Sequence, residues 1–294
     1  MYTLPSNISE LVSAALSEDI GSGDITAELL PETSGVIAAI QCKERAVICG
    51  IPWANEVFDQ IDNTVQIEWS VGEGELVEAG KQLAKINGPV RAILSGERTA
   101  LNFLQTLSGT ATKTRELVDL IANSCSSLLD TRKTLPGLRT AQKYAVRVGG
   151  GENHRQGLFD AFLIKENHIA ASGGINAALA QAKKLNPDKT LEIEVQNLEE
   201  LSQALTGKPD IIMLDNFSLD LIEQAVALNN GRCKLEASGG ISEELLVKIA
   251  KTGVDYISVG ALTKHCKAID LSLLVQDHFP VSYTHLTLPT ILLV

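Results

Sequence analysis

The sequence predicts an α/β protein in which a short parallel α/β barrel of about six strands follows an N-terminal α+β domain. Two observations predict this fold. From about residue 126 onward, short apolar runs alternate with stretches of helical periodicity, a pattern typical of βαβ units and a parallel sheet. Before about residue 110, strand-like and helix-like runs follow one another without that alternation. An open, doubly wound sheet is the alternative to the barrel.

Six short apolar runs are the expected strands of the barrel. They lie at 126–131, 160–165, 191–197, 211–216, 234–240 and 256–261. Helical patterns separate the later runs, at 175–185, 198–205, 219–228 and 243–253. Six such units with right-handed connections suggest a short barrel rather than the full eight-fold one.

The first part of the chain is expected to form a separate α+β layer. It has helical patterns at 8–16 and 52–61, a longer one after Ser95, and strand-like runs at 36–42, 46–49 and 65–71. Residues 71–89 have the glycine spacing of lipoyl or biotinyl carrier domains, but no lysine beside a methionine follows at a hairpin tip. We interpret this stretch as a series of structural turns.

The predicted domains are therefore 1–110, 111–274 and an atypical tail, 275–294. Residues 281–294 are rich in threonine and leucine, lack charged side chains and do not match the preceding pattern. We expect this last segment to be non-native and leave it out of the functional argument.

Composition and charge exclude several classes of function. The net charge of −11 disfavours nucleic acids and anionic membranes as partners, because both require a positive protein surface. No apolar run approaches the ~20 residues that span a bilayer, and the N-terminus lacks the pattern of a signal peptide. The five scattered cysteines form no C-x-x-C pair and are expected to be reduced thiols of a cytoplasmic protein.

Positive charge is concentrated in one segment of this acidic chain. Residues 132–165 contain seven Lys/Arg and only two acids, Glu152 and Asp160; the cations are Arg132, Lys133, Arg139, Lys143, Arg147, Arg155 and Lys165. A local cationic region in an acidic protein suits a small anion held in a cleft. A solvated helix face accounts equally well for Arg139, Lys143 and Arg147, which are spaced at i, i+4 and i+8. It does not account for the other four cations.

Polar residues follow several of the predicted strands. Active sites of parallel barrels lie at the carboxyl ends of the strands, and the residues expected there are Asp130–Lys133, Asn153–Arg155, Lys165–His168 and Asp215–Asn216. Along 191–197, alternation places Glu192, Glu194 and Gln196 on the face opposite the apolar residues. Charged residues in a barrel lumen are costly unless they are paired or functional. Cations and carboxylates are thus expected to meet at one end of the barrel.

Glycine runs follow the last two predicted strands. They are Ser238, Gly239 and Gly240 after the fifth strand, and Val259, Gly260 and Ala261 after the sixth. Backbone N–H groups before a helix bind anions, and glycine lets a phosphate approach closely. Since the loops after the last strands of barrels frequently hold phosphate, these two runs predict a phosphate site.

The ordered motifs resemble quinolinate phosphoribosyltransferase, the decarboxylating nicotinate-nucleotide pyrophosphorylase. They are DTRKT (130–134), GGGENHR (149–155), FLIKENH (162–168), LEIEVQN (191–197), MLDNF (213–217), EASGGI (236–241) and SVGALTKH (258–265). EDIGSGDIT and SGERTALNFLQTLSGTAT (95–112) near the N-terminus are similar too. The resemblance covers roughly residues 8–274 and is lost after about Leu274.

The resemblance implies a fold, a reaction and an assembly. The fold is an N-terminal α/β sandwich with a short α/β barrel, and the assembly is a homodimer, or a set of dimers, with shared active sites. The reaction is that of nicotinate-nucleotide diphosphorylase (carboxylating), a pentosyltransferase of NAD biosynthesis. It joins quinolinate to 5-phosphoribosyl 1-diphosphate and gives nicotinate mononucleotide, carbon dioxide and diphosphate, with Mg²⁺ as cofactor.

The resemblance also implies roles for individual residues. Quinolinate is a dianion and is expected to bind Arg132, His154, Arg155 and Lys165, with a hydroxyl from Thr131 and with Arg98 contributed by the neighbouring subunit. Lys133 is expected at the diphosphate. Glu194 and Asp215 bind ribose hydroxyls or the hydrated metal, and the 5′-phosphate lies on Ser238–Gly240 and Val259–Ala261. The residues expected to be catalytic are Lys133, Lys165, Glu194 and Asp215.

Two alternatives stay open at this point. A related barrel transferase that uses a pyridine with one carboxylate is disfavoured by three cations, Arg132, Arg155 and Lys165, because a monoacid needs fewer. A non-catalytic barrel that binds a sugar phosphate explains the glycine runs but not Glu194 and Asp215 opposite the cations.

Overall fold

A computed structural model describes residues 2–280, and these form two compact units. One unit, here called the barrel unit, comprises Gly109–Ala268 with the described residues up to Pro5. The other, the N-terminal unit, comprises Ser6–Ser108 with the described residues from Ile269 onward. Helix α3 (Val90–Leu120) contributes residues to both. The sequence predicts the start of α3 after Ser95, whereas it begins directly after Pro89.

The barrel unit contains a six-stranded parallel sheet, as predicted. Its strands are β6 (Ser127–Leu129), β7 (Ala161–Ile164), β8 (Thr190–Val195), β9 (Ile211–Asp215), β10 (Lys234–Ser238) and β11 (Tyr256–Ser258). Their order is β6-β11-β10-β9-β8-β7, so the first strand in the sequence pairs with the last. This order is that of a curled sheet and excludes the doubly wound alternative, in which the strand order reverses at a switch point.

The barrel is open between its two edge strands. No ladder joins β6 to β7 among the described residues. A single bridge instead places Glu152 beside Leu129 of β6, and the Glu152 N–H donates to the Leu128 carbonyl at 2.8 Å. The segment that precedes β7 therefore occupies the edge of β6, and it carries His154 and Arg155 with it.

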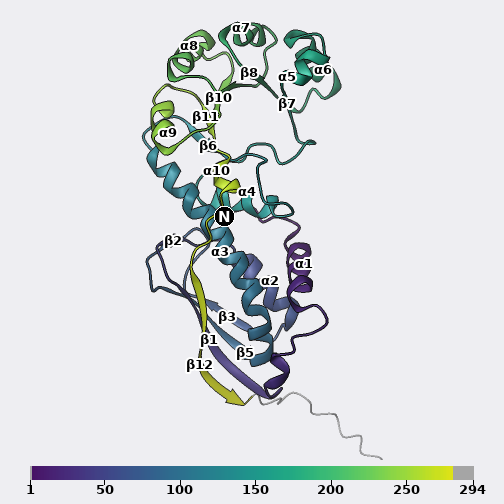
Figure 1. Cartoon of the computed structure of the whole chain (residues 1–294), viewed down its shortest axis with the longest axis vertical. Helices are drawn as coiled ribbons and strands as arrows, with labels where there is room; N and C mark the ends of the chain where they lie inside the picture. The colour runs from purple at the N-terminus through teal and green to yellow at the C-terminus, as the bar shows by residue number, and fades with distance from the viewer. Residues whose placement is uncertain (1, 281–294) are drawn as a thin grey trace, which may run out of the picture. The chain divides into compact units, whose positions relative to one another are not determined.

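Helices α6 to α9 cover the outer side of the curled sheet (Figure 1). Besides α3, the helices of this unit are α4 (Arg139–Val148), α5 (Glu166–Ala171), α6 (Ile175–Leu185), α7 (Leu198–Thr206), α8 (Leu219–Asn229), α9 (Glu243–Ala250) and the short α10 (Ala261–Lys264). The core between sheet and helices includes Leu191, Ile193 and Val195 of β8, packed with residues such as Leu201 and Ile212. Alternation along β8 thus turns Glu192 and Glu194 into the lumen, as predicted.

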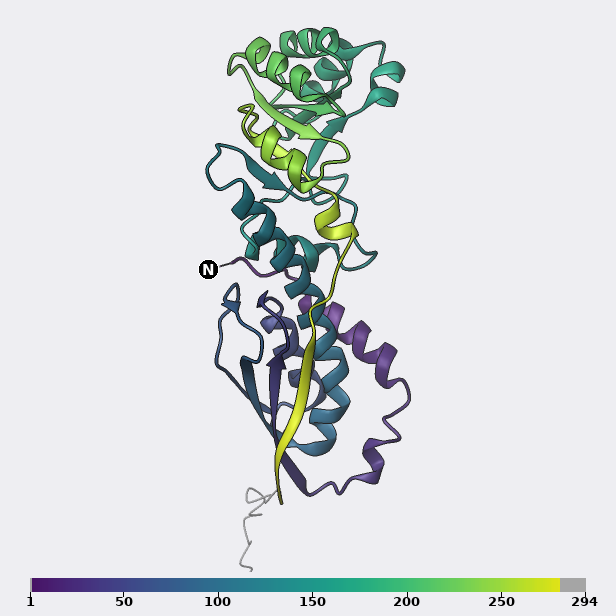
Figure 2. The same ribbon diagram turned by 60° about the vertical axis from the view of Figure 1, so that its left-hand side comes forward.

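The N-terminal unit is built on an antiparallel sheet in the order β12-β1-β5-β3, with α2 and α3 on one face (Figure 2). Its elements are α1 (Ile8–Ile20), a 3₁₀ turn (Ala27–Leu29), β1 (Ser34–Cys42), β2 (Ala46–Val47), α2 (Ile51–Ile61), β3 (Gln66–Trp69), β4 (Leu76–Val77), β5 (Gln82–Pro89) and β12 (Leu271–Pro280). At Gly96 of α3, a Cβ atom would lie 2.8 Å from Phe58 and 2.9 Å from Ile61 of α2. Glycine thus permits close packing of the two helices.

Two strands of this sheet were not predicted. β5 lies inside the stretch interpreted as turns, and it pairs with both β1 and β3. β12 pairs with β1 along its whole length, from Cys42 opposite Leu271 to Ser34 opposite Pro280. Residues 275–280 of the predicted atypical tail therefore form part of a regular sheet. The segment 281–294, predicted to be non-native, lies outside the described residues. In the part of the chain that is described, no helix is long and apolar enough to cross a membrane.

Candidate active site at the barrel mouth

A pocket of about 210 Å³ lies at the carboxyl ends of the barrel strands. The predicted site residues that line it are Thr131, Arg132, Lys133, His154, Arg155, Lys165, Glu194, Asp215 and Ser238. The pocket walls also include Leu163, Met213, Glu236 and Ser258. The residues come from all six strand ends and from the segment beside β6. The parallel topology thus brings together side chains that are up to 127 residues apart in sequence, from Thr131 to Ser258.

Two arginines, Arg132 and Arg155, line the pocket, and neither forms an ion pair among the described residues. Burial, and then the like charge of Arg132, lower the pKa of Arg155 below its ordinary value. Among the described residues, no carboxylate lies within ion-pair distance of either guanidinium, and the buried Nε of Arg132 has no hydrogen-bond partner. Like charges held together in a partly buried site are stabilised by an anion. Carboxylates suit two guanidinium forks in particular.

Lys165 and Glu194 form an ion pair across the mouth. Lys165 follows β7, Glu194 lies near the end of β8, and the ammonium donates to Oε2 of the carboxylate. The lysine side chain is 41% exposed and the glutamate side chain 8%. Asp215, at the end of β9, accepts a hydrogen bond from the side chain of Asn216 at 2.9 Å. Cations and carboxylates thus alternate around the pocket.

His154, Glu192 and Glu236 form a polar cluster inside the barrel. Nε2 of His154 lies 2.9 Å from Oε2 of Glu192 and 3.6 Å from Oε2 of Glu236. Burial, and then the charge of Glu192, raise the pKa of Glu236 to about 8. Burial alone would lower the pKa of His154, but the hydrogen bond to Glu192 and the charges of both glutamates raise it above its ordinary value. The two glutamates therefore favour a proton on Nε2 of the imidazole.

This cluster is the one group in residues 2–280 whose histidine and carboxylate atoms converge as metal ligands do. The geometry of the histidine argues against such a role. Nδ1 of His154 accepts a hydrogen bond from the backbone N–H of Arg155 at 2.7 Å, which places the proton of the neutral ring on Nε2. Nε2, which lies 2.9 Å from Oε2 of Glu192, then carries the proton and has no lone pair for a metal.

The two glycine runs lie beside the mouth. Gly239 and Gly240 have φ angles of +109° and +35°, and a Cβ on Gly239 would lie 2.2 Å from Oδ1 of Asn216. A Cβ on Gly260 would lie 3.0 Å from Cδ of Lys133 and 3.3 Å from Oγ1 of Thr131. Gly239 and Gly260 therefore have no room for a side chain, and Gly260 lies beside Lys133, the residue predicted at the diphosphate.

One part of the phosphate prediction needs correction. The sequence argument uses the N-terminus of the helix after each glycine run. Helix α9 begins at Glu243, carries two glutamates in its first turn, and has an N-cap, Ser242, whose side chain already accepts from the Leu245 N–H. Acidic residues there oppose a second anion, so the glycine backbone and Ser238 are left as the phosphate donors of that run.

The remaining predicted residues lie outside the pocket lining. Val259 is buried in the core, and with Ala261 it lines a different cavity, beside α9. Arg98 is exposed on α3 within the N-terminal unit. Its predicted role belongs to a second subunit, and the single chain described here does not test it.

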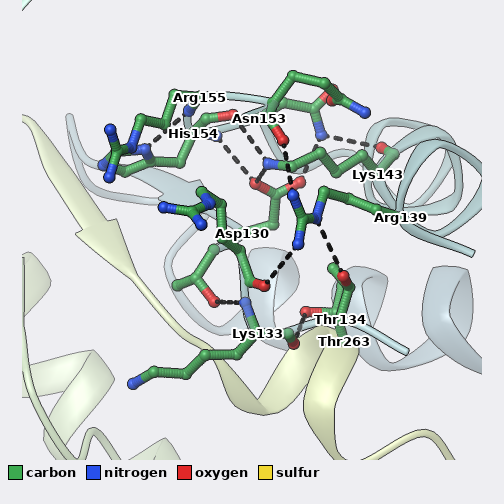
Figure 3. Close-up of polar contacts among 12 residues, drawn as sticks. Asp130, Lys133, Thr134, Arg139, Lys143, Asn153, His154, Arg155 and Thr263 are labelled. Carbon is green, nitrogen blue, oxygen red and sulfur yellow. Dashed lines mark hydrogen bonds and ion pairs between the residues drawn. The ribbon is translucent and has the colours of Figure 1, made fainter. Parts of the chain in front are cut away.

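Sequence reasoning missed a buried network beneath the mouth (Figure 3). Asp130 accepts hydrogen bonds from the Lys143 ammonium, from the Asn153 amide at 2.6 Å and from the His154 N–H at 2.9 Å. The Lys143 side chain is 2% exposed, so the interpretation of this helix face as solvated is wrong for Lys143 and holds only for the exposed Arg147. The absence of acidic residues from α4 was the available signal.

Arg139, one turn before Lys143, also contacts the cationic segments. Its guanidinium donates to Oγ1 of Thr134 at 3.2 Å and to the Gln156 carbonyl at 3.2 Å. Helix α4 therefore contacts both the segment after β6 and the segment before β7.

Comparison with family models gives matches along most of the chain. Residues 24–108 match the N-terminal domain of quinolinate phosphoribosyl transferase, and residues 110–274 match its C-terminal domain. Together these matches extend over well more than half of the 294 residues.

Individual relatives agree with the family match. The chain is 39% identical to quinolinate phosphoribosyltransferase (decarboxylating) 2b of Nicotiana tabacum, over 92% of this chain and 82% of that protein. It is 38% identical to nicotinate-nucleotide pyrophosphorylase (carboxylating) of Arabidopsis thaliana, over 92% and 83%. The solved nicotinate-nucleotide pyrophosphorylase of Francisella tularensis is 54% identical, with a TM-score of 0.91 and coverage of 94% and 98%. This chain therefore belongs to the quinolinate phosphoribosyltransferase family.

Proposed function

We propose that this chain is an enzyme that joins quinolinate to 5-phosphoribosyl 1-diphosphate and releases carbon dioxide and diphosphate. The product is nicotinate mononucleotide, a precursor in NAD biosynthesis. Membership of the family supports this proposal. The observation that carries it is the pocket in which Arg132 and Arg155 lie together without a carboxylate partner, because a dicarboxylate is the anion that such a site would bind.

Quinolinate binds on the cationic side of the pocket. Arg132 and Arg155 take its carboxylates as guanidinium forks, and Lys165 adds a third cation. His154, whose ring lies against Glu192, lines the same pocket and contacts the substrate. Thr131 supplies a hydroxyl. Three cations match a dianion better than the single carboxylate of nicotinate, which favours the dicarboxylate over the alternative substrate.

The phosphoribosyl donor binds on the opposite side. Lys133 faces the diphosphate, and the backbone of Ser238–Gly240 and of Val259–Ala261 receives the 5′-phosphate. Glu194 and Asp215 face the ribose. As diphosphate leaves, positive charge develops on the sugar, and these carboxylates stabilise it. A non-catalytic sugar-phosphate barrel would not need that pair.

Mg²⁺ fits the donor set. Glu194 and Asp215 are carboxylates at one edge of the pocket, and magnesium is typically bound by one or two carboxylates together with substrate phosphates. These residues would hold it directly or through water. When bound, it neutralises charge on the leaving diphosphate.

Loss of carbon dioxide follows from the new bond. Once ribose is attached, the pyridinium nitrogen is positive and stabilises the carbanion left when the adjacent carboxylate departs as carbon dioxide. A proton then replaces that carboxylate on the ring. The residues of the pocket orient the substrate and exclude water during this step.

We further propose a cytoplasmic homodimer, or an assembly of dimers, in which Arg98 of one subunit completes the pocket of the other. The cysteines support this location, since all five are free thiols. Neither nucleic acid nor a membrane is expected as a partner, given the net charge of −11.

One assay tests the reaction. The purified protein is incubated with quinolinate carrying a labelled 2-carboxylate, 5-phosphoribosyl 1-diphosphate and Mg²⁺, and labelled carbon dioxide and nicotinate mononucleotide are measured. We expect both products in equal amounts, and neither when the phosphoribosyl donor is left out. Binding of the donor without any turnover would favour the non-catalytic barrel instead.

A further inference from the structure

The backbone of His154 is held from both sides by one buried ion pair. Its N–H donates to Oδ1 of Asp130 at 2.9 Å, and its carbonyl accepts from the Lys143 ammonium at 2.8 Å. The Lys143 ammonium also contacts Asp130 itself. The amide of the preceding residue, Asn153, donates to Asp130 at 2.6 Å and to the Lys143 carbonyl at 2.9 Å. The three groups that donate to the Asp130 carboxylate thus come from Lys143, Asn153 and His154.

The pair is buried more completely than the pocket residues that it supports. The side chains of Lys143 and Asp130 are 2% and 0% exposed. Burial raises the pKa of Asp130 and lowers that of Lys143, against their mutual attraction. A buried ion pair generally adds little net stability compared with apolar residues of the same size. Its contribution is therefore to be sought in what it orients.

The pair orients a segment that lacks regular secondary structure. Between α4 and β7, the only ladder contact of residues 149–160 in the described chain is the bridge at Glu152. Residues 153–155 follow that bridge directly and carry two of the quinolinate contacts proposed above. With both main-chain groups of His154 fixed, its ring faces Glu192, and the next side chain, Arg155, lies in the pocket.

We propose that Asp130 and Lys143 are positioning residues for quinolinate: their ion pair fixes the His154–Arg155 segment so that these two side chains face the substrate (Figure 3). This inference rests on the proposed function, which assigns those two side chains to quinolinate. It adds two residues that touch no substrate. Among residues 2–280, no hydrogen bond or ion pair joins either member of the pair to the side chain of Lys133 or to the glycine runs, which serve the phosphoribosyl donor. A defect in the pair should therefore act on one substrate much more than on the other.

The test removes the pair without leaving a buried charge alone. The double variant Asp130→Asn/Lys143→Met keeps the approximate size of both side chains and is neutral. A second variant, Asn153→Ala, removes one donor from the network at an exposed residue. Arg147→Met is the matched control, because Arg147 lies one turn from Lys143 on α4 and is exposed. KM for each substrate, kcat and the melting temperature are measured for all three and for Arg155→Ala.

We expect the KM for quinolinate to rise about 10- to 100-fold in the double variant, as for a site displaced by about 1 Å, while the KM for the phosphoribosyl donor changes less than about threefold. Asn153→Ala should also raise the KM for quinolinate more than the KM for the phosphoribosyl donor, but by a smaller factor. If the double variant does not fold, Asn153→Ala alone tests the positioning role. Arg147→Met should behave as the unaltered protein.

Other outcomes overturn the inference. A lower melting temperature with both KM values unchanged, or an equal rise in both, would mean that the pair is only structural. If Arg155→Ala raises the KM for quinolinate while the pair variants do not, the inference fails and the proposed function stands. If Arg155→Ala itself leaves that KM unchanged, the assignment of Arg155 to quinolinate fails, and the positioning role fails with it.

Discussion

Lys165 donates a hydrogen bond to Glu194 across the barrel mouth. The proposed function assigns the lysine to quinolinate and the glutamate to the ribose or the metal, so binding of the substrates must separate this pair. An ion pair with one partly exposed member is worth about 0.2–1 kcal/mol. In the unliganded protein, this ion pair therefore opposes the contact between Lys165 and quinolinate by about 0.2–1 kcal/mol.

Glu194→Gln should release Lys165. We expect quinolinate alone to bind ~1.4- to 5-fold more tightly, the fold-change that corresponds to 0.2–1 kcal/mol, while turnover falls strongly because the ribose loses a carboxylate. Calorimetric titration with quinolinate and a steady-state assay measure the two effects. Glu166→Gln is the control, since Glu166 is exposed next to Lys165 and should change neither. Weaker quinolinate binding in Glu194→Gln would show that the glutamate orients the lysine for the substrate.

Arg155→Ala should raise the KM for quinolinate far more than the KM for the phosphoribosyl donor. A buried carboxylate left without its cation costs ~2–5 kcal/mol, which is at least a ~30-fold change in binding. Steady-state kinetics with each substrate varied in turn give the comparison. Equal effects on both substrates would mean that Arg155 does not contact quinolinate.

Activity should require a divalent metal and both carboxylates of the substrate. The basis is the arrangement of Glu194 and Asp215 opposite the cations of the pocket. Excess chelator should abolish turnover, and added Mg²⁺ should restore it. Nicotinate should not replace quinolinate, because it leaves one guanidinium fork without a partner. Full turnover in chelator, or equal rates with the two acids, would contradict the prediction.

Stability should fall as the pH rises from about 5 to 8, in part through Glu236. Its pKa in the folded protein is about 8, against an ordinary value of 4.5, so over this interval the unfolded chain releases a proton that the folded chain keeps. This stabilisation is fully present below the pKa of Glu236 in the unfolded chain, and it is lost as the pH rises through the pKa of Glu236 in the folded protein. The free energy of unfolding changes by at most about 1.4 kcal/mol per pH unit through this one group. The raised pKa of His154 acts in the same direction.

Glu236→Gln isolates that contribution. Melting curves of this variant between pH 6 and 8.5 should show a weaker decline than those of the unaltered protein, and the residual decline belongs to His154. Glu244→Gln, an exposed change in α9, is the control and should leave the decline unchanged. An identical pH dependence in Glu236→Gln would mean that Glu236 is ionised in the folded protein at neutral pH.

The barrel and its mouth were predictable from the sequence because local pattern determines them. Apolar runs set the strands, and parallel topology places every strand end at one edge, so Arg132, Lys165, Glu194 and Asp215 could be brought together without coordinates. Alternation along β8 gave the lumen position of Glu194. The same alternation on β10 would have predicted Glu236 between the core residues Leu235 and Ala237, but it was not applied there.

Other features depend on contacts that sequence spacing does not encode. β12 is a strand because it pairs with β1, more than 230 residues earlier, and its own residues give only a weak alternating pattern. Lys143 has the helical spacing of a solvated cation, and its burial arises because Asp130, directly after β6, contacts α4 in the folded protein. The hydrogen bonds between this ion pair and the backbone of His154 are tertiary contacts, and no sequence pattern predicts them.

The last prediction concerns Arg98, which lies on α3 of the N-terminal unit. If it completes the pocket of a partner subunit, Arg98→Ala and Lys165→Ala homodimers should both be nearly inactive. A mixed dimer then places both defects in one site and leaves the other site intact. After dissociation and random reassociation of equal amounts, half of the dimers are mixed and each has one good site of two, so ~25% of the unaltered activity should return.

Subunit exchange must be verified independently, for example by native mass spectrometry of variants of different mass. Arg91→Ala mixed with Lys165→Ala serves as the control, because Arg91 lies on the same helix but donates to the Leu30 carbonyl within its own unit. That mixture should give the average activity of its two parents and no more than this. If exchange is confirmed and the Arg98→Ala mixture regains nothing, Arg98 acts in its own subunit or in none, because only a residue contributed across the interface allows two inactive chains to assemble one complete site.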